Sequence, residues 1–238
     1  MDWRLPPELP WPQFLRLLRH PAPPKGWLEA AAALEDVQRR PMLLRWIAQH
    51  RQTPAHLRMR LLPRLPWRAL AAIAADGAAH PQARAWCVER LQALWTGLSL
   101  GERRGFAMLA PRPLWPAIWR VRDAGVTAAF LQHPKLGLEA LLGLLQPPLL
   151  PTHLDALLRS RWAGLHPVAL QVLDAMDRSF RLPEHGLVLG QAAPWIKVLT
   201  PEARILAASR MQHPPLRLLT RAWGGHPVEA LQEGPDAG

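Results

Sequence analysis

The chain has 238 residues, a formal net charge of +11, 49% hydrophobic residues and 20% charged residues. This length and apolar content suffice for a buried core and exclude a chain that is disordered throughout. Leucine contributes 44 residues, whereas valine, isoleucine and threonine together contribute 20 and tyrosine is absent. Because sheets are rich in β-branched and aromatic residues, this composition argues against a mainly β fold and predicts an all-α protein.

The 27 prolines mark the starts of short helices rather than loops. Pro41, Pro54 and Pro81 each precede apolar residues at helical spacing, and a proline in the first helical turn loses no intrahelical hydrogen bond. We predict short proline-initiated helices over residues 12–19, 26–40, 42–50, 54–62, 67–75, 81–97, 100–110, 113–123, 125–132, 136–145, 151–160, 167–178, 184–197, 201–211 and 214–223.

The chain also repeats short segments at its predicted helix boundaries. Gln132-His133-Pro134-Lys135-Leu136 recurs as Gln212-His213-Pro214-Pro215-Leu216, and six of the ten histidines directly precede proline. Similar boundary segments that recur at irregular spacing favour an α-solenoid, which is a superhelix of stacked short helices, over a compact helical bundle. We predict one α-helical repeat domain over residues 1–228 and a frayed C-terminal tail over residues 229–238.

The repeats themselves resemble a known class of protein. Short degenerate repeats that open with His-Pro or Thr-Pro and continue into Leu- and Ala-rich helices are similar to bacterial HEAT-like and leucine-rich-repeat-variant proteins. The run from Leu65-Pro66-Trp67-Arg68 to Leu114-Trp115 resembles bacterial helical-repeat proteins of uncharacterised function, and the similarity extends over residues 41–175. The resemblance implies a concave binding scaffold without catalytic residues. Some leucine-rich-repeat-variant proteins hold an iron–sulfur cluster on several N-terminal cysteines, but Cys87 is the single cysteine here, so no cofactor is predicted.

Positive charge is concentrated in the first half of the chain. Residues 1–125 contain 19 basic and 9 acidic residues, and no acidic residue lies between Asp36 and Asp76. If the helices stack, the arginines of this stretch form a basic face that could attract nucleic acid, an acidic protein or a membrane surface, although a solvated outer face is the simpler explanation. The candidate binding residues are Arg39, Arg40, Arg45, Arg51, Arg58, Arg60, Arg64 and Arg68.

Tryptophan dominates the aromatic residues, with twelve against four phenylalanines. Trp46 and Trp67 interleave with the arginines and could stack on bases, although tryptophans at helical spacing more often belong to the core. Trp115 and Trp119 lie one helical turn apart. They indicate either a buried interior helix or an exposed aromatic groove for a partner helix.

Motifs for catalysis and metal binding are absent from the sequence. It contains no HExxH, CxxC or Gly-x-Ser-x-Gly motif and no glycine-rich phosphate loop, and Cys87 sits between Trp86 and Val88 as an inert packing residue. Ser99 and Glu102 have the spacing of a helix capping box. HEAT-like DNA glycosylases share this architecture, but nothing selects Asp76, Glu102 or Asp123 as their catalytic acid. We predict no enzymatic activity, metal, cofactor or small-molecule substrate.

Our leading hypothesis is a non-catalytic protein-interaction scaffold, and the alternative is a nucleic-acid-binding protein that uses the basic face at residues 39–68. The N-terminus, with Asp2, Pro6 and Pro7, does not resemble a signal peptide. The most apolar window, residues 136–150, contains Glu139 and is shorter than a transmembrane helix. We therefore expect a cytoplasmic protein, in a bacterium if the resemblance holds.

Overall fold

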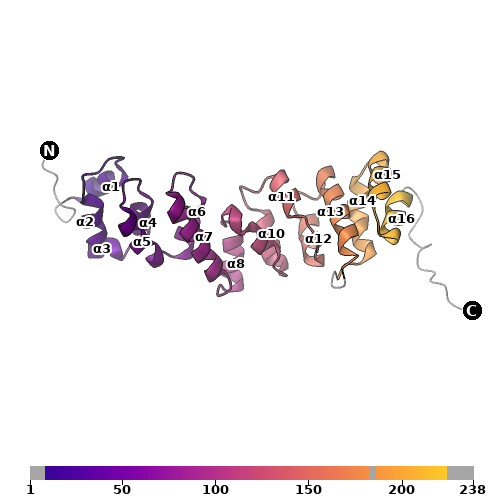
Figure 1. The fold of residues 1–238 in the computed structure, drawn as a ribbon, viewed down its shortest axis with the longest axis horizontal. Coiled ribbons are helices and arrows are strands. Elements are labelled where there is room, and N and C mark those ends of the chain that lie inside the picture. Colours follow the sequence, from indigo (N-terminus) through magenta and orange to yellow (C-terminus); the bar gives the residue numbers. More distant parts are fainter. Residues whose placement is uncertain (1–8, 183–185, 224–238) are drawn as a thin grey trace, which may run out of the picture. The chain divides into compact units, whose positions relative to one another are not determined.

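The computed structural model describes residues 9–182 and 186–223, and all regular secondary structure in these residues is helical (Figure 1). The α-helices are α1 (Trp11–Arg19), α2 (Trp27–Ala33), α3 (Glu35–Gln38), α4 (Pro41–Gln49), α5 (Ala55–Leu61), α6 (Trp67–Ala75), α7 (Pro81–Trp95), α8 (Leu100–Ala107), α9 (Trp115–Trp119), α10 (Ala124–Leu131), α11 (Leu138–Leu144), α12 (Pro151–Leu158), α13 (His166–Ser179), α14 (Ala193–Val198), α15 (Pro201–Arg210) and α16 (Pro214–Ala222). Short 3-10 helices also occur between them, among them η2 (Leu62–Arg64), η3 (Arg112–Leu114) and η4 (Leu189–Ala192). The prediction of an all-α protein is confirmed.

Contacts divide the chain into two compact units, residues 1–118 and 119–238, which we call the N-terminal and C-terminal units. The single domain over residues 1–228 stays a prediction, and the tail over residues 229–238 lies outside the described residues. None of the described helices combines the length and apolar composition that a membrane span requires.

Prolines begin five of the described helices, whereas Pro54, which was also expected to begin a helix, is the N-cap residue before α5. Pro41, Pro81, Pro151, Pro201 and Pro214 are the first residues of their helices. At this position the missing N–H would have no intrahelical partner, and the fixed φ of proline already suits the helix.

Three predicted boundaries are wrong. The helix expected over residues 26–40 is two helices, because Leu34 adopts an extended conformation with φ −64° and ψ 131° between α2 and α3. The helix expected over residues 113–123 ends at Trp119, since Asp123 is instead the N-cap of α10 and its Oδ1 accepts a hydrogen bond from the Val126 N–H at 2.7 Å. Of the helix expected over residues 184–197, only η4 and α14 form within the described part.

In the N-terminal unit, three histidines at 30-residue intervals make the same turn. The Nδ1 atoms of His20, His50 and His80 accept hydrogen bonds from the backbone N–H two residues later, at 3.1, 3.1 and 3.2 Å. Because Nδ1 accepts, the proton of each neutral ring is on Nε2, and the Nε2 of His50 donates to the His20 carbonyl at 2.9 Å. The helices before His20 and His50 are thereby tied together at their C-terminal ends.

Leucine and isoleucine side chains fill the core of the N-terminal unit. Ile47, Leu57, Leu70 and Ile73, from α4, α5 and α6, are each at most 1% exposed. α4 packs against both α5 and α6 and so joins the core side chains of the three helices.

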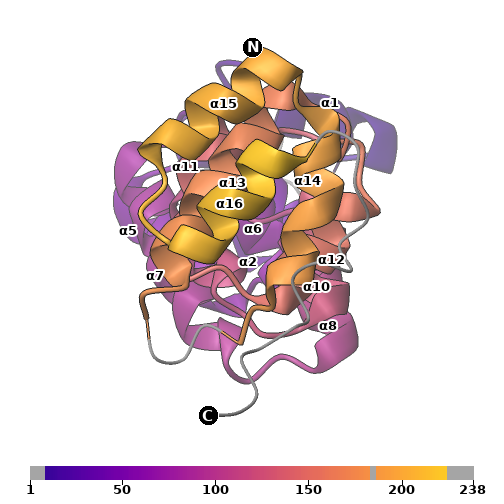
Figure 2. The ribbon, with the colours of Figure 1, turned by 90° about the vertical axis from the view of Figure 1, so that its right-hand side faces the viewer.

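α13 lies among several helices of the C-terminal unit (Figure 2). This helix contacts α11, α14 and α15, and α15 packs in turn on α16. Val172, Leu173 and Met176 of α13 are fully buried, and so are Trp195 of α14 and Leu216 of α16. α13 is therefore the element that positions the surfaces of this unit.

Candidate binding surfaces

The eight candidate arginines do not form one face. Arg39, Arg40, Arg64 and Arg68 are exposed near the starts of α4 and α6, and we call these four residues the arginine edge. Arg60 is exposed in the last turn of α5, four residues before Arg64. The remaining three, Arg45, Arg51 and Arg58, lie elsewhere.

The arginine edge exists because neighbouring helices run parallel. The Arg64 side chain donates to Gln38 Oε1 at 3.4 Å, next to the start of α4, and the Gln49 side chain donates to Asp76 Oδ2 at 3.4 Å, where α4 and α6 end. α4 and α6 therefore begin at the same edge, which brings Arg40 and Arg68 to it.

α1 joins the same edge through two arginine–tryptophan contacts. The guanidinium of Arg40, just before α4, lies over the Trp11 indole, and that of Arg19 at the end of α1 lies over Trp46, both at 4.7 Å. The start of α1 therefore lies beside the start of α4, and the end of α1 lies beside the middle of α4. The two helices run in the same direction. Trp11 is 41% exposed at the edge, and its ring stacks on Phe14 with ring centroids 5.1 Å apart and an interplanar angle of 7°.

Arg58 does not belong to an exposed basic face. It is only 6% exposed, and its guanidinium donates to the carbonyls of Ala48, His50 and Thr53 at 3.0, 3.2 and 3.0 Å. Carbonyls at the end of a helix lack intrahelical donors, so Arg58 supplies the donors for the end of α4. Burial lowers the pKa of Arg58 from its usual value.

Arg45 and Arg51 also lie apart from the arginine edge. Arg45 is half-buried in α4, and its Nε is buried without a hydrogen-bond partner among the described residues. Arg51 is exposed in the turn that follows α4, at the opposite end of that helix from Arg40.

Trp115 and Trp119 are core residues rather than an aromatic groove. They are 4% and 5% exposed, and Trp115 Nε1 donates to the Ala110 carbonyl at 2.9 Å. Trp119 stacks on His153 within the C-terminal unit. Of the two interpretations of this helix, the structure supports the buried one.

A groove lies between α13 and α15 in the C-terminal unit. Its volume is about 450 Å³. The lining residues are Pro167, Leu170, Gln171, Asp174 and Asp177 of α13, together with Ala207, Arg210 and Met211 of α15 and its C-terminal end. Leu206, 55% exposed, directly precedes the lining residue Ala207 and adds apolar surface to α15.

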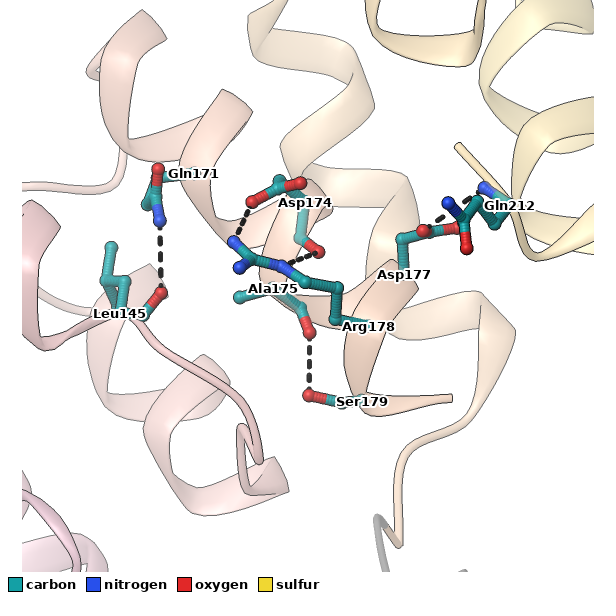
Figure 3. A network of polar contacts seen from close by, with 8 residues as sticks. All are labelled: Leu145, Gln171, Asp174, Ala175, Asp177, Arg178, Ser179 and Gln212. Atoms are coloured by element: carbon teal, nitrogen blue, oxygen red, sulfur yellow. Dashed lines mark hydrogen bonds and ion pairs between the residues drawn. The ribbon is translucent and has the colours of Figure 1, made fainter. Parts of the chain in front are cut away.

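Both carboxylates of the groove are held in structural contacts (Figure 3). Asp174 forms an ion pair with Arg178 on the same helix. Asp177 is 4% exposed and accepts hydrogen bonds from the backbone N–H groups of Gln212 at 3.0 Å and His213 at 2.7 Å. Asp177 thus fixes the loop between α15 and α16, to which the lining residue Met211 belongs.

The acids considered for glycosylase chemistry likewise serve local structure. Asp76 Oδ1 accepts from the Ala78 N–H at 2.9 Å, Asp123 caps α10, and Glu102 forms the predicted capping box with Ser99. Hydrogen bonds from the Ser99 side chain and backbone lower the pKa of Glu102. These carboxylates stabilise helix ends.

The cysteine thiol and the potential metal ligands do not form a reactive site in the described residues. Cys87 is fully buried, and burial raises the pKa of its thiol to about 12. Within the ranges that the structure describes, no three His, Cys, Asp or Glu side chains come together as metal ligands.

The groove was missed by the sequence analysis. Asp174 and Asp177, three residues apart in an otherwise apolar stretch of α13, were the available signal, since acids on one face of a largely buried helix need partners. Arg178, four residues after Asp174 on the same helix, could be read as its partner, but the partners of Asp177 could not, because they lie 35 and 36 positions away.

Comparison of the chain with protein-family models, with curated proteins and with solved structures found no match. The resemblance to HEAT-like and leucine-rich-repeat-variant proteins stays a prediction.

Proposed function

We propose that this chain is a non-catalytic protein-interaction scaffold of the helical-repeat, HEAT-like type, and that it binds a segment of a partner protein in the groove between α13 and α15. The observation that carries this proposal is the groove itself. A volume of about 450 Å³ falls in the size range of binding clefts.

The lining of the groove suits a polypeptide. Leu170, Ala207 and Met211 provide an apolar floor, and the charged side chains of Asp174 and Arg210 flank it on opposite helices. An amphipathic segment can bury its apolar side chains on such a floor and place polar groups at the flanks. Exposed Leu206 extends the apolar surface on the α15 side.

Repetition within the N-terminal unit supports the solenoid part of the proposal. α1 and α4 run in the same direction, and equivalent turns at His20, His50 and His80 recur every 30 residues. Repeats of 20–50 residues whose helices stack side by side are typical of α-solenoids.

The test is site-directed photo-crosslinking in the full chain, with a photoreactive residue at Leu206 and a groove-filling Ala207→Arg variant beside it. Ala207 lines the groove and is half-buried, so the long arginine side chain occupies the cleft. Crosslinked partners should disappear in Ala207→Arg and persist in Ala222→Arg, the same substitution at an exposed position of α16. Unchanged crosslinking in Ala207→Arg would contradict the proposal.

A further inference from the structure

We propose that the arginine edge of the N-terminal unit binds the backbone of single-stranded nucleic acid. This site lies in the other unit from the groove and does not depend on the function proposed for the groove. The proposal rests on positive charge, on guanidiniums that lie over tryptophans, and on the spacing of parallel helices.

Three of the four arginines of the arginine edge have no ion-pair partner among the described residues. Arg39 forms an ion pair with Glu35, and Glu102 lies close enough to Arg68 for their charges to interact, although no carboxylate among the described residues lies within ion-pair distance of Arg40, Arg64 or Arg68. The N-terminal ends of α4 and α6 lie at the same edge, and helix N-termini add partial positive charge. The edge therefore complements a chain of phosphates rather than an isolated anion.

Two guanidiniums at this edge lie over the indole rings of tryptophans. Arg40 lies over Trp11 at 4.7 Å and Arg68 lies over Trp67 at 5.2 Å. Each indole is in turn supported by a phenylalanine: Trp11 by Phe14 at 5.1 Å and Trp67 by Phe106 at 5.5 Å.

An arginine placed in this way can make two kinds of contact at once. Its N–H donors point outward in the plane of the guanidinium, where they match phosphate oxygens, and its free face can stack on an unpaired base. No hydrogen bond joins Arg40 or Arg68 to another residue in the described ranges, so their donors are not already used. Base stacking of this kind requires an unpaired strand and favours single-stranded over duplex nucleic acid.

The dimensions fit several consecutive nucleotides. Neighbouring packed helices have axes about 8–10 Å apart, so the starts of α1, α4 and α6 extend over about 20 Å. Contacts with three or four phosphates predict that log K falls with log salt concentration with a slope of about −2 to −3 for a single strand.

The experiment is fluorescence anisotropy of labelled oligo-dT and oligo-U of about 20 nucleotides, titrated with the full chain over a salt series. The test variant is Arg40→Glu/Arg64→Glu/Arg68→Glu, in which all three changed side chains are exposed. The matched control is Arg159→Glu/Arg217→Glu/Arg221→Glu, which changes the net charge equally on exposed positions of the C-terminal unit. Circular dichroism checks that both variants fold.

We expect the edge variant to bind about tenfold or more weakly at low salt, and the control to stay within about threefold of the unchanged chain. Absence of binding at about 50 mM salt, or equal weakening in the control, would overturn the proposal. Tighter binding to duplex DNA would overturn its single-stranded part, and equal affinity for poly-glutamate would assign the edge to an acidic protein instead. The groove variant Ala207→Arg should bind oligonucleotides unchanged, which separates the two proposals.

Discussion

The imidazole of His153 stacks on the indole of Trp119, with ring centroids 4.4 Å apart and an interplanar angle of 20°. The histidine is 2% exposed, and its Nδ1 accepts a hydrogen bond from the Leu150 N–H at 3.3 Å, at the start of α12. This arrangement requires the neutral ring, because a protonated Nδ1 cannot accept. Burial accordingly lowers the pKa of His153 from 6.5 to about 4.

The lowered pKa makes acid stability depend on His153. Between pH 6.5 and about 4 the unfolded chain binds a proton that the folded chain excludes, so stability falls as the pH falls through this window. Because each unit of pKa difference corresponds to 1.36 kcal/mol, the free energy of unfolding falls by about 3 kcal/mol over the whole window. The variant His153→Phe keeps an aromatic ring in the stack but has no group that titrates. Between pH 7 and pH 4 its free energy of unfolding, measured by urea unfolding, should fall by about 3 kcal/mol less than that of the unchanged chain. Exposed His56→Phe is the control, and an identical pH dependence in all three proteins would contradict the role of His153.

Arg58 and Arg60 are two residues apart but should differ in their effects on stability. Arg58→Ala removes the donors for three carbonyls in a buried site and is expected to lower the free energy of unfolding by about 2–4 kcal/mol. Arg60→Ala changes an exposed side chain and should stay within about 0.5 kcal/mol. Urea unfolding of both variants tests the difference, and equal stabilities would show that the buried contacts of Arg58 contribute nothing.

Sequence features that act over a few residues predicted many of the helices, whereas contacts between residues far apart in the chain could not be predicted. Pro41 and Pro81 begin their helices because the restriction that proline places on φ acts within one residue. Leu34 breaks the helix expected over residues 26–40 although its neighbours are good helix formers, since tertiary packing can override propensity.

The candidate surface shows the same contrast between local and distant information. The sequence identified the acid-free stretch that contains Arg40, Arg58 and Arg68, but it could not distinguish exposed from buried arginines. Arg58 reaches back ten residues to the Ala48 carbonyl, whereas Arg68 lies over its own neighbour Trp67. Only the packing of α4 against α5 and α6 separates a structural arginine from an available one.

Cys87 should be unreactive in the folded chain. Burial raises the pKa of its thiol to about 12, so only about one thiol in ten thousand is ionised at pH 8. We expect no reaction with Ellman's reagent over an hour under native conditions and reaction of one thiol per chain in urea. Rapid stoichiometric labelling of the native protein would mean that α7 opens readily around Cys87.

Asp177 should hold the groove in shape, whereas Asp174 should not. The Asp177 carboxylate accepts from two backbone N–H groups of the α15–α16 loop, so Asp177→Ala leaves those groups without their partner and should cost about 2–4 kcal/mol. Asp174→Ala removes only an exposed ion pair with Arg178 and should cost less than about 1 kcal/mol. Hydrogen exchange in α16 should accelerate in Asp177→Ala alone. If both variants exchange alike, the loop is fixed by apolar packing and the carboxylate of Asp177 is dispensable for the groove.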